Sequence, residues 1–344
     1  MCCLFGLLDI EHTLSPKEKN WMMSILGTVC EARGVDATGY SYISNRKLVI
    51  KKKAVPAHEM TFNIPRDAYA IMGHTRMTTC GPATRPLNNH PFLGKLAKTQ
   101  FALAHNGVLS NDEILRKAEN LPQTNIETDS YVAVQLIEKE STLDFNSLKA
   151  MAKKVKGTFT FTVLDQKNNL YIIKGNNPLC LYYFPKKGIY IYASTKPILE
   201  AALDVMGYMD QSHEEIPIAE GEIIKIDAAG RITRDHFQPP VSNSQYYDFY
   251  DYYEDLWGGW EPVEEAPSGY RKYLMDYALM MGIPQKELDY LHRIGLPDFE
   301  LEECIYNKQY RRMCLLDTGY YSSEMEDYIY EINDCSESLS FMQT

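Results

Sequence analysis

The chain has 344 residues, of which 45% are hydrophobic and 24% are charged, and its formal net charge is −11. This length and composition are typical of a folded protein with one large domain or two smaller ones. No apolar run approaches the ~20 residues that cross a bilayer, and the first residues lack the basic start of a signal peptide. We therefore expect a cytoplasmic protein without a membrane segment.

The eight cysteines are scattered, with no CxxC pair and no regular spacing to the eight histidines. This pattern excludes a disulfide framework and a zinc finger, so we expect reduced thiols, no metal and no cofactor. Five of them are predicted to be small hydrophobic residues in the core or on helix faces. These five are Cys30, Cys180, Cys304, Cys314 and Cys335.

The negative charge lies in the last hundred residues. Residues 241–344 hold 21 acidic and 7 basic residues, a balance of −14, which leaves +3 for residues 1–240. The same segment holds 15 of the 25 tyrosines. We predict a first domain over residues 2–240 and an acidic, tyrosine-rich region over 241–344. Its charge argues against nucleic acid as a partner, and its aromatic run at 246–260 either docks a partner protein or packs on its own domain.

The first 240 residues alternate between helical and strand patterns. A helix is predicted over 16–33, ending at Gly34. Short runs with period-two alternation, closed by Asn and Gly turns, predict antiparallel strands. These strands are expected at 47–52, 68–76, 101–107, 158–165, 169–175, 179–184, 188–194 and 222–227.

Helical patterns stand between groups of strands. Ser110 and Glu113 have the spacing of a capping box ahead of a helix, and amphipathic helices are predicted at 128–141 and 196–207. Grouped strands with grouped helices indicate an α+β fold, in which helices cover antiparallel sheets. Beyond residue 245 the pattern becomes mainly helical, with helices expected at 269–281, 286–294, 300–316 and 323–334.

The second residue, Cys2, is suited to nucleophilic catalysis. If Met1 is removed, Cys2 carries both a thiol and a free α-amino group. A thiol attacks only after losing its proton, and an α-amino group with an ordinary pKa of ~7.7–8.0 can take that proton at neutral pH. One residue would then supply both the nucleophile and the general base.

Other polar motifs offer what such a nucleophile needs to attack an amide. The Asn106 side chain and the Gly107 backbone N–H would donate to the oxyanion that forms. Arg76 is suited to bind the α-carboxylate of an amino-acid substrate, and Asp129 to bind its α-ammonium group. Each motif is weak alone, and the prediction rests on their combination.

Together the motifs resemble a known family. Cys2 with "RGVDATG" (33–39), "GHTRMTTCG" (73–81), "NNHPF" (88–92), "HNGVLSN" (105–111) and "ETDSYV" (127–132), in this order, resembles the class II glutamine amidotransferase domain of the N-terminal nucleophile hydrolases. Glucosamine-6-phosphate synthase and glutamine phosphoribosylpyrophosphate amidotransferase carry such domains. The similarity covers about residues 2–235 and implies a four-layer αββα sandwich.

The resemblance also implies further roles. Thr79 and Cys80 would line the glutamine pocket, and Arg33 matches the family arginine near the nucleophile. His74 and His90 would be structural. Two positions depart from the family pattern, because Cys3 stands where relatives usually have glycine, and Met77 stands where an aromatic residue commonly follows the arginine.

The function that we expect is hydrolysis of glutamine to glutamate and ammonia through a γ-glutamyl thioester on Cys2. The ~100 residues after 240 lack a phosphate-binding loop, so we expect either that a separate synthetase-like chain, docked by the acidic region, accepts the ammonia, or that no acceptor exists and the enzyme is a stand-alone glutaminase. Two alternatives stay open: hydrolysis of another γ-glutamyl amide, and a non-catalytic glutamine-sensing interaction protein. The sequence does not decide the oligomeric state.

Overall fold

The computed structural model describes residues 2–239, 269–280 and 283–296, together with residues 301, 302, 304, 305, 311, 314 and 315. The chain divides into two units, Met1–Pro262 and Val263–Thr344, which we describe separately. None of the helices in these described stretches is long and apolar enough to cross a membrane.

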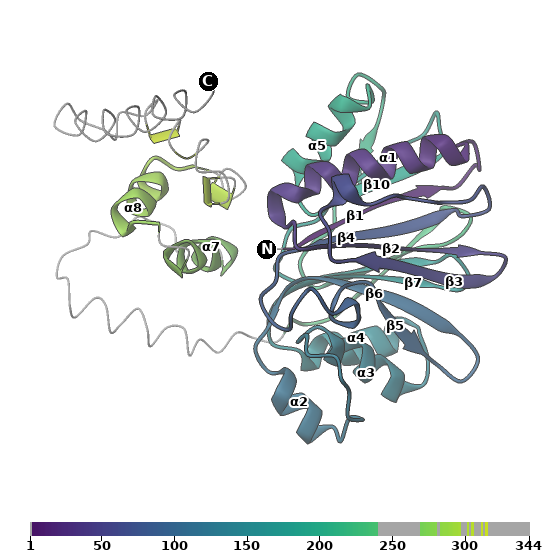
Figure 1. The fold of residues 1–344 in the computed structure, drawn as a ribbon, viewed down its shortest axis with the longest axis horizontal. Helices are drawn as coiled ribbons and strands as arrows, with labels where there is room; N and C mark the ends of the chain where they lie inside the picture. Colours follow the sequence, from purple (N-terminus) through teal and green to yellow (C-terminus); the bar gives the residue numbers. More distant parts are fainter. Residues whose placement is uncertain are drawn as a thin grey trace, which may run out of the picture. The chain divides into compact units, whose positions relative to one another are not determined.

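The first unit contains two antiparallel sheets (Figure 1). The larger sheet has the strand order β11-β9-β10-β1-β4-β2-β3, so the amino-terminal strand β1 lies in its centre. Every pairing within it is antiparallel. Its strands are β1 (Cys3–Asp9), β2 (Ala37–Ser44), β3 (Lys47–Lys53), β4 (Ala70–Arg76), β9 (Cys180–Phe184), β10 (Ile189–Ala193) and β11 (Glu214–Glu215).

The smaller sheet has the order β13-β12-β8-β7-β6-β5 and is also antiparallel throughout. Its longest pairing joins β6 to β7, from Phe101 opposite Asp165 to Leu109 opposite Gly157. Its strands are β5 (Phe92–Lys95), β6 (Gln100–Leu109), β7 (Gly157–Asp165), β8 (Leu170–Lys174), β12 (Glu222–Ile226) and β13 (Ile232–His236).

Helices cover the outer faces of the two sheets, as Figure 1 shows. Helices α1 (Pro16–Val29) and α5 (Lys196–Val205) pack on the larger sheet, whereas α3 (Tyr131–Glu140) and α4 (Phe145–Lys154) pack on the smaller one. Helix α2 (Asp112–Ala118) lies beside α3, and one-turn helices are η1 (Cys30–Arg33), η2 (Ala57–Glu59) and η3 (Pro86–Asn88).

Three hydrophobic clusters lie between these layers. One lies between the larger sheet and its helices, one between the smaller sheet and its helices, and the third joins the inner faces of the two sheets through residues such as Leu4, Met72, Ala104 and Ile172. The order is therefore helix, sheet, sheet, helix. The predicted α+β, four-layer αββα sandwich is confirmed.

The predicted capping box at Ser110 and Glu113 is wrong. Asn111 is the N-cap of α2 and makes no side-chain cap hydrogen bond. Its side chain instead donates to Lys154 O at 2.9 Å and accepts from Lys156 N at 2.8 Å. The backbone N–H of Ser110 donates to Lys156 O, so this segment is bound to the chain ahead of β7 instead of capping the helix.

In the second unit the described residues form α7 (Gly269–Met280) and α8 (Gln285–Arg293). Both agree with helices predicted from the sequence. The aromatic run at 246–260, the helix predicted at 323–334 and most of the helix predicted at 300–316 lie outside the described residues. The boundary between residues 240 and 241 also falls there, so the domain division stays a prediction.

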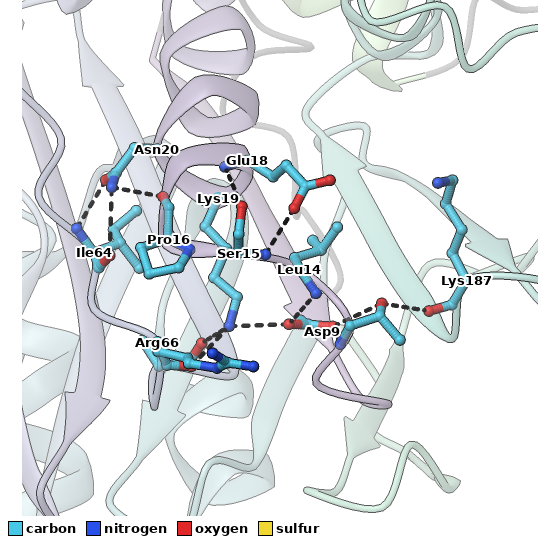
Figure 2. A network of polar contacts seen from close by, with 12 residues as sticks. Asp9, Leu14, Ser15, Pro16, Glu18, Lys19, Asn20, Ile64, Arg66 and Lys187 are labelled. Carbon is cyan, nitrogen blue, oxygen red and sulfur yellow. Dashed lines mark hydrogen bonds and ion pairs between the residues drawn. The ribbon is translucent and has the colours of Figure 1, made fainter.

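A buried ion pair connects β1 to α1 and the loop before β4 (Figure 2). Lys19 Nζ lies 2.9 Å from Asp9 Oδ2, and both side chains are 0% exposed. The ammonium group also donates to Arg66 O at 3.1 Å and Ala68 O at 2.7 Å. Asp9 accepts from the backbone N–H groups of the turn that leads into α1, so every charged atom has partners.

Replacing Lys19 with methionine is expected to lower the free energy of unfolding by about 3–5 kcal/mol, because Asp9 stays buried without its counter-charge. Chemical denaturation at neutral pH measures this difference. The matched control is Lys196→Met, which breaks a pair with Glu215 whose side chains are 51% and 49% exposed. That change should cost no more than ~1 kcal/mol. Equal losses in the two variants would contradict the expectation.

Candidate active site

The predicted nucleophile Cys2 stands directly before β1. Because Cys3 pairs with Thr75 of β4, the register places Cys2 beside Arg76 at the end of that strand. The thiol is buried, and its Sγ lies 3.6 Å from Met77 O. A hydrogen bond of 2.8 Å from Leu4 N to Ser194 Oγ holds the start of the strand.

Arg33 links the nucleophile to the other sheet. Its Nε donates to Cys2 O at 3.0 Å, and its Nη2 lies 3.5 Å from Asn106 Oδ1. The side chain is 2% exposed. It reaches this position because Gly34 lets the chain pass close to β4, where an added Cβ would lie 2.4 Å from the Arg76 carbonyl carbon. Arg33 therefore bridges the Cys2 backbone and the Asn106 side chain across the sandwich.

Asn106 has a buried donor with no partner among the described residues. Its Oδ1 faces Arg33, which identifies Nδ2 as the other end of the amide, and Nδ2 makes no hydrogen bond to the part of the chain described here. Such a group is costly unless a ligand satisfies it. Asn177 Nδ2 donates to Asn106 O at 2.8 Å and fixes the backbone of this pair.

Gly107 follows with φ of +141°, a conformation that side chains rarely adopt. A Cβ at this position would lie 1.9 Å from Thr158 O, so only glycine fits here.

Arg76 is buried and bound by a loop. Its Nη1 donates to Asn89 Oδ1 at 2.6 Å, and its Nη2 donates to the carbonyl groups of Cys80 and Gly81, at 2.8 Å for Gly81. These contacts use three of its five N–H donors. Its charge acts on both Cys2 and Asp129.

Asp129 is also buried, and its Oδ2 accepts from Leu109 N at 2.6 Å. Asn88 holds the segment that precedes Asp129, because its side chain donates to Glu127 Oε2 at 2.8 Å and accepts from Glu127 N at 3.0 Å. The structure therefore brings together Cys2, Arg76 and Asp129, whose charges interact.

Comparisons with known proteins agree with this geometry. Residues 74–201 match the family described as glutamine amidotransferase domain. The chain is 28% identical over 241 residues to the isomerizing glutamine--fructose-6-phosphate aminotransferase of Sulfurisphaera tokodaii, which covers 66% of this chain and 40% of that protein. The enzyme of the same name from Aquifex aeolicus is 33% identical over 159 residues, covering 43% of this chain and 26% of that protein.

The chain is therefore similar to glutamine amidotransferase domains. Solved structures agree with its fold. The glutamine phosphoribosylpyrophosphate amidotransferase from B. subtilis superposes with a TM-score of 0.54 at 22% identity, over 69% of this chain and 49% of that one. A structure titled as the allosteric regulatory enzyme of purine biosynthesis gives 0.55 at 20% identity, over 81% and 58%. The family resemblance inferred from the motifs is confirmed.

Burial controls the protonation of the candidate site. It raises the pKa of the Cys2 thiol above its ordinary value, although the charge of Arg76 opposes this shift. A general base is therefore needed to produce the thiolate. Burial also lowers the pKa of His74 to about 3 and that of His105 to about 4, so both imidazoles are neutral at physiological pH.

Two buried histidines contact the strand that carries Asn106. His74 Nε2 lies 3.0 Å from His105 O, directly before Asn106. His105 Nε2 lies 3.2 Å from Thr158 O, which assigns the proton to Nε2, and its Nδ1 lies 2.7 Å from Ser130 Oγ. The predicted structural role of His74 stays a prediction.

Thr79 and Cys80 are less enclosed than the other predicted residues. Both are exposed, and Thr79 makes no hydrogen bond to any residue the structure describes. Cys80 Sγ lies 3.2 Å from Glu127 O, and burial followed by the charge of Asp129 raises the pKa of its thiol. No group of three His, Cys, Asp or Glu side chains in the described segments is arranged to hold a metal.

The sequence did not reveal three asparagines of the candidate site. Asn88 and Asn89 stand in the quoted "NNHPF" motif, which marked their position without indicating their partners. Asn177 stands in "GNNPL", between two strands, where an asparagine usually indicates only a turn. Its contact with Asn106 joins residues 71 positions apart, which local patterns do not predict.

His90 makes the stability of the first unit sensitive to acid. Its ring packs against His74 and Phe92, with centroids 4.1 and 4.4 Å away, and neither ring nitrogen has a partner among the described residues. Burial, with the charges of Arg76 and Lys52, lowers its pKa well below 6.5. The unfolded chain thus binds a proton near pH 6.5 that the folded state excludes, and stability falls as the pH drops below that value.

Replacing His90 with phenylalanine should therefore reduce the loss of stability on acidification. Between pH 7 and pH 5 the free energy of unfolding of the variant should fall by about 2 kcal/mol less than that of the wild type. Denaturant titrations at the two pH values measure this, with His236→Gln, at an exposed residue, as the control. A parallel decline in wild type and His90→Phe would contradict the expectation.

Proposed function

We propose that the protein hydrolyses the side-chain amide of glutamine to glutamate and ammonia, with Cys2 as the nucleophile. The chain spans 26–40% of the two curated relatives described above, so its own activity is inferred from the site. The observation that carries the proposal is the buried, unpartnered Nδ2 of Asn106, which Arg33 holds on the same side as Cys2. A donor in this state is prepared for an oxyanion.

The proposed reaction begins once Met1 is absent. The α-amino group of Cys2 takes the thiol proton, and Sγ attacks the γ-carboxamide carbon of glutamine. Asn106 Nδ2 and the Gly107 N–H donate to the oxygen as it becomes negative. The amino group then returns the proton to the leaving nitrogen, which departs as ammonia. Water attacks the γ-glutamyl thioester in the same way and releases glutamate.

Arg76 and Asp129 are proposed to recognise the amino-acid end of glutamine. The contacts described above use three of the five N–H donors of Arg76, which leaves two that can bind the α-carboxylate. Asp129 uses Oδ2 for Leu109 N and receives a 3.3 Å contact from Ser130 Oγ at Oδ1. A carboxylate has about four lone-pair sites, which leaves capacity for an α-ammonium group.

The acceptor of the ammonia is proposed to be a separate synthetase-like chain. Support comes from the acidic balance of −14 in residues 241–344, which would attract a basic partner surface. This proposed docking would be supported if the full chain captures such a partner and a chain without residues 241–344 does not. Equal capture by both forms would contradict it.

The proposed hydrolysis is tested by measuring glutamate and ammonia released from glutamine by the purified chain. Mass spectrometry first establishes that Cys2 is the N-terminal residue. 6-Diazo-5-oxo-norleucine should label Cys2 covalently and stop the reaction. A γ-glutamyl anilide assayed in parallel distinguishes glutamine from other γ-glutamyl amides. If the processed protein, with its partner present, releases no glutamate, the proposal is wrong.

A further inference from the structure

Cys3 and Cys30 form a buried pair of thiols beside the proposed nucleophile. Their Sγ atoms are 3.0 Å apart, although the residues are 27 positions apart in the chain. Cys3 begins β1, Cys30 begins η1, and both are 0% exposed. An S–S bond is ~2.05 Å long, so a movement of about 1 Å would join them. The proposed hydrolysis uses neither sulfur.

The backbone on both sides of this pair is held in place. Thr75 Oγ1 donates to Cys30 O at 3.1 Å, and Ser194 Oγ accepts from Leu4 N at 2.8 Å. Strand β1 is central in its sheet, between β10 and β4. The two sulfurs therefore face each other because the fold positions them, and their approach does not depend on a mobile loop.

The surroundings also favour one thiolate in this pair. Burial alone raises the pKa of a thiol, but the contact with Cys30 and the charge of Arg33 lower the pKa of Cys3 to about 7. Burial and the contact with Cys3 raise the pKa of Cys30 well above its ordinary value. A thiolate at Cys3 beside a thiol at Cys30 is the arrangement from which disulfides form after oxidation.

We propose that Cys3 and Cys30 are a redox modification site, which hydrogen peroxide converts into an intramolecular disulfide. Cys3 Sγ attacks a peroxide oxygen, the O–O bond breaks, and Cys3 becomes a sulfenic acid while the other oxygen leaves as water. Cys30 Sγ then attacks Cys3 Sγ, the S–O bond breaks, and a second water leaves as the S–S bond forms. Two thiols are oxidised by two electrons, and one hydrogen peroxide is reduced to two waters.

Hydrogen peroxide is the expected oxidant because the pair is buried. A small neutral molecule can reach such a site during brief local opening, whereas a bulky disulfide such as oxidised glutathione cannot. The bond would connect β1 to the turn that carries Arg33, whose Nε holds Cys2 O. It would thereby close a loop that contains the whole of α1. This loop would restrict the conformations of the unfolded chain and so stabilise the folded state.

The test uses the full-length chain as Cys2→Ser, which removes the competing nucleophilic thiol. The reduced protein is treated with graded hydrogen peroxide up to the dose that oxidises exposed Cys80, then alkylated under denaturing conditions and digested without reduction. The expected result is a cross-linked peptide pair containing Cys3 and Cys30 that dithiothreitol separates. Three results would overturn the proposal: alkylation of both Cys3 and Cys30, oxidation of Cys3 beyond the sulfenic acid while Cys30 stays a free thiol, and a disulfide between either residue and another cysteine.

Two further variants and one further measurement complete the test. Cys30→Ser should abolish the cross-link, whereas Cys180→Ser, at a buried cysteine outside the pair, should keep it. The oxidised Cys2→Ser protein should melt about 5–10 °C above its reduced form. Cys30→Ser should show no such rise. A cross-link that persists in Cys30→Ser, or an unchanged melting temperature in a fully cross-linked sample, would also overturn the proposal.

Discussion

Cys2→Ala is expected to lower the rate of glutamate release by about 10⁴-fold or more, because no other group can form the thioester. Binding of glutamine should change little, since Arg76 and Asp129 are untouched. Steady-state assays of glutamate release, together with equilibrium binding of glutamine, measure the two effects separately. The α-amino group still forms at residue 2 of this variant, so its loss cannot explain the result.

Cys180→Ala serves as the control, because Cys180 is a buried cysteine at the start of β9 and is not among the proposed site residues. Its activity should equal that of the wild type. Cys3→Gly, which restores the residue that relatives usually have, should also keep its activity. Retention of activity in Cys2→Ala combined with its loss in Cys3→Gly would show that the nucleophile has been assigned wrongly.

Asn106→Asp is expected to lower kcat by at least 10²–10³-fold, a range typical of losing one oxyanion donor. Aspartate keeps the volume of the side chain and an oxygen for the Arg33 contact, but it replaces the Nδ2 donor with a negative charge facing the oxyanion. KM should change much less, because the donor matters most as the charge develops. Complete kinetic curves in glutamine distinguish the two constants.

The same substitution at Asn63, an exposed residue outside the site, should leave both constants unchanged. Circular dichroism and melting curves establish whether Asn106→Asp is folded. A folded Asn106→Asp protein with a raised KM and an unchanged kcat would assign Asn106 to glutamine binding instead of stabilisation of the oxyanion.

The sequence predicted strands in which two kinds of side chain alternate along the chain. Strands such as β7 and β10 agree with the predicted runs, although the structure buries nearly all of their residues. β1 was not predicted, because its sequence CLFGLLD shows no such alternation. β2 begins inside the polar "RGVDATG" motif, and α4 begins at an Asp144–Ser147 capping box that is less familiar than one ending in glutamate.

The sequence predicted those residues of the candidate site whose side-chain type is itself suited to the reaction. Cys2, Arg76, Asn106 and Asp129 are of types that suit attack on an amide, and the structure brings them to one end of the sandwich. Their supporting contacts were not predictable. The bond from Asn89 to Arg76 and the 3.0 Å approach of Cys3 to Cys30 depend on how distant segments pack, which no local pattern in the sequence records.

The position of Arg33 between the two sheets also has a consequence for biosynthesis. Cys2 and the Asn106 donor on β6 stand about 100 residues apart in the chain, and Arg33 connects the two only when the sheets are stacked. A chain whose smaller sheet has not yet formed therefore lacks the surroundings proposed for Cys2. Under the proposed function, ammonia release would begin only after the sandwich has closed, so the onset of activity during synthesis would report completion of the fold.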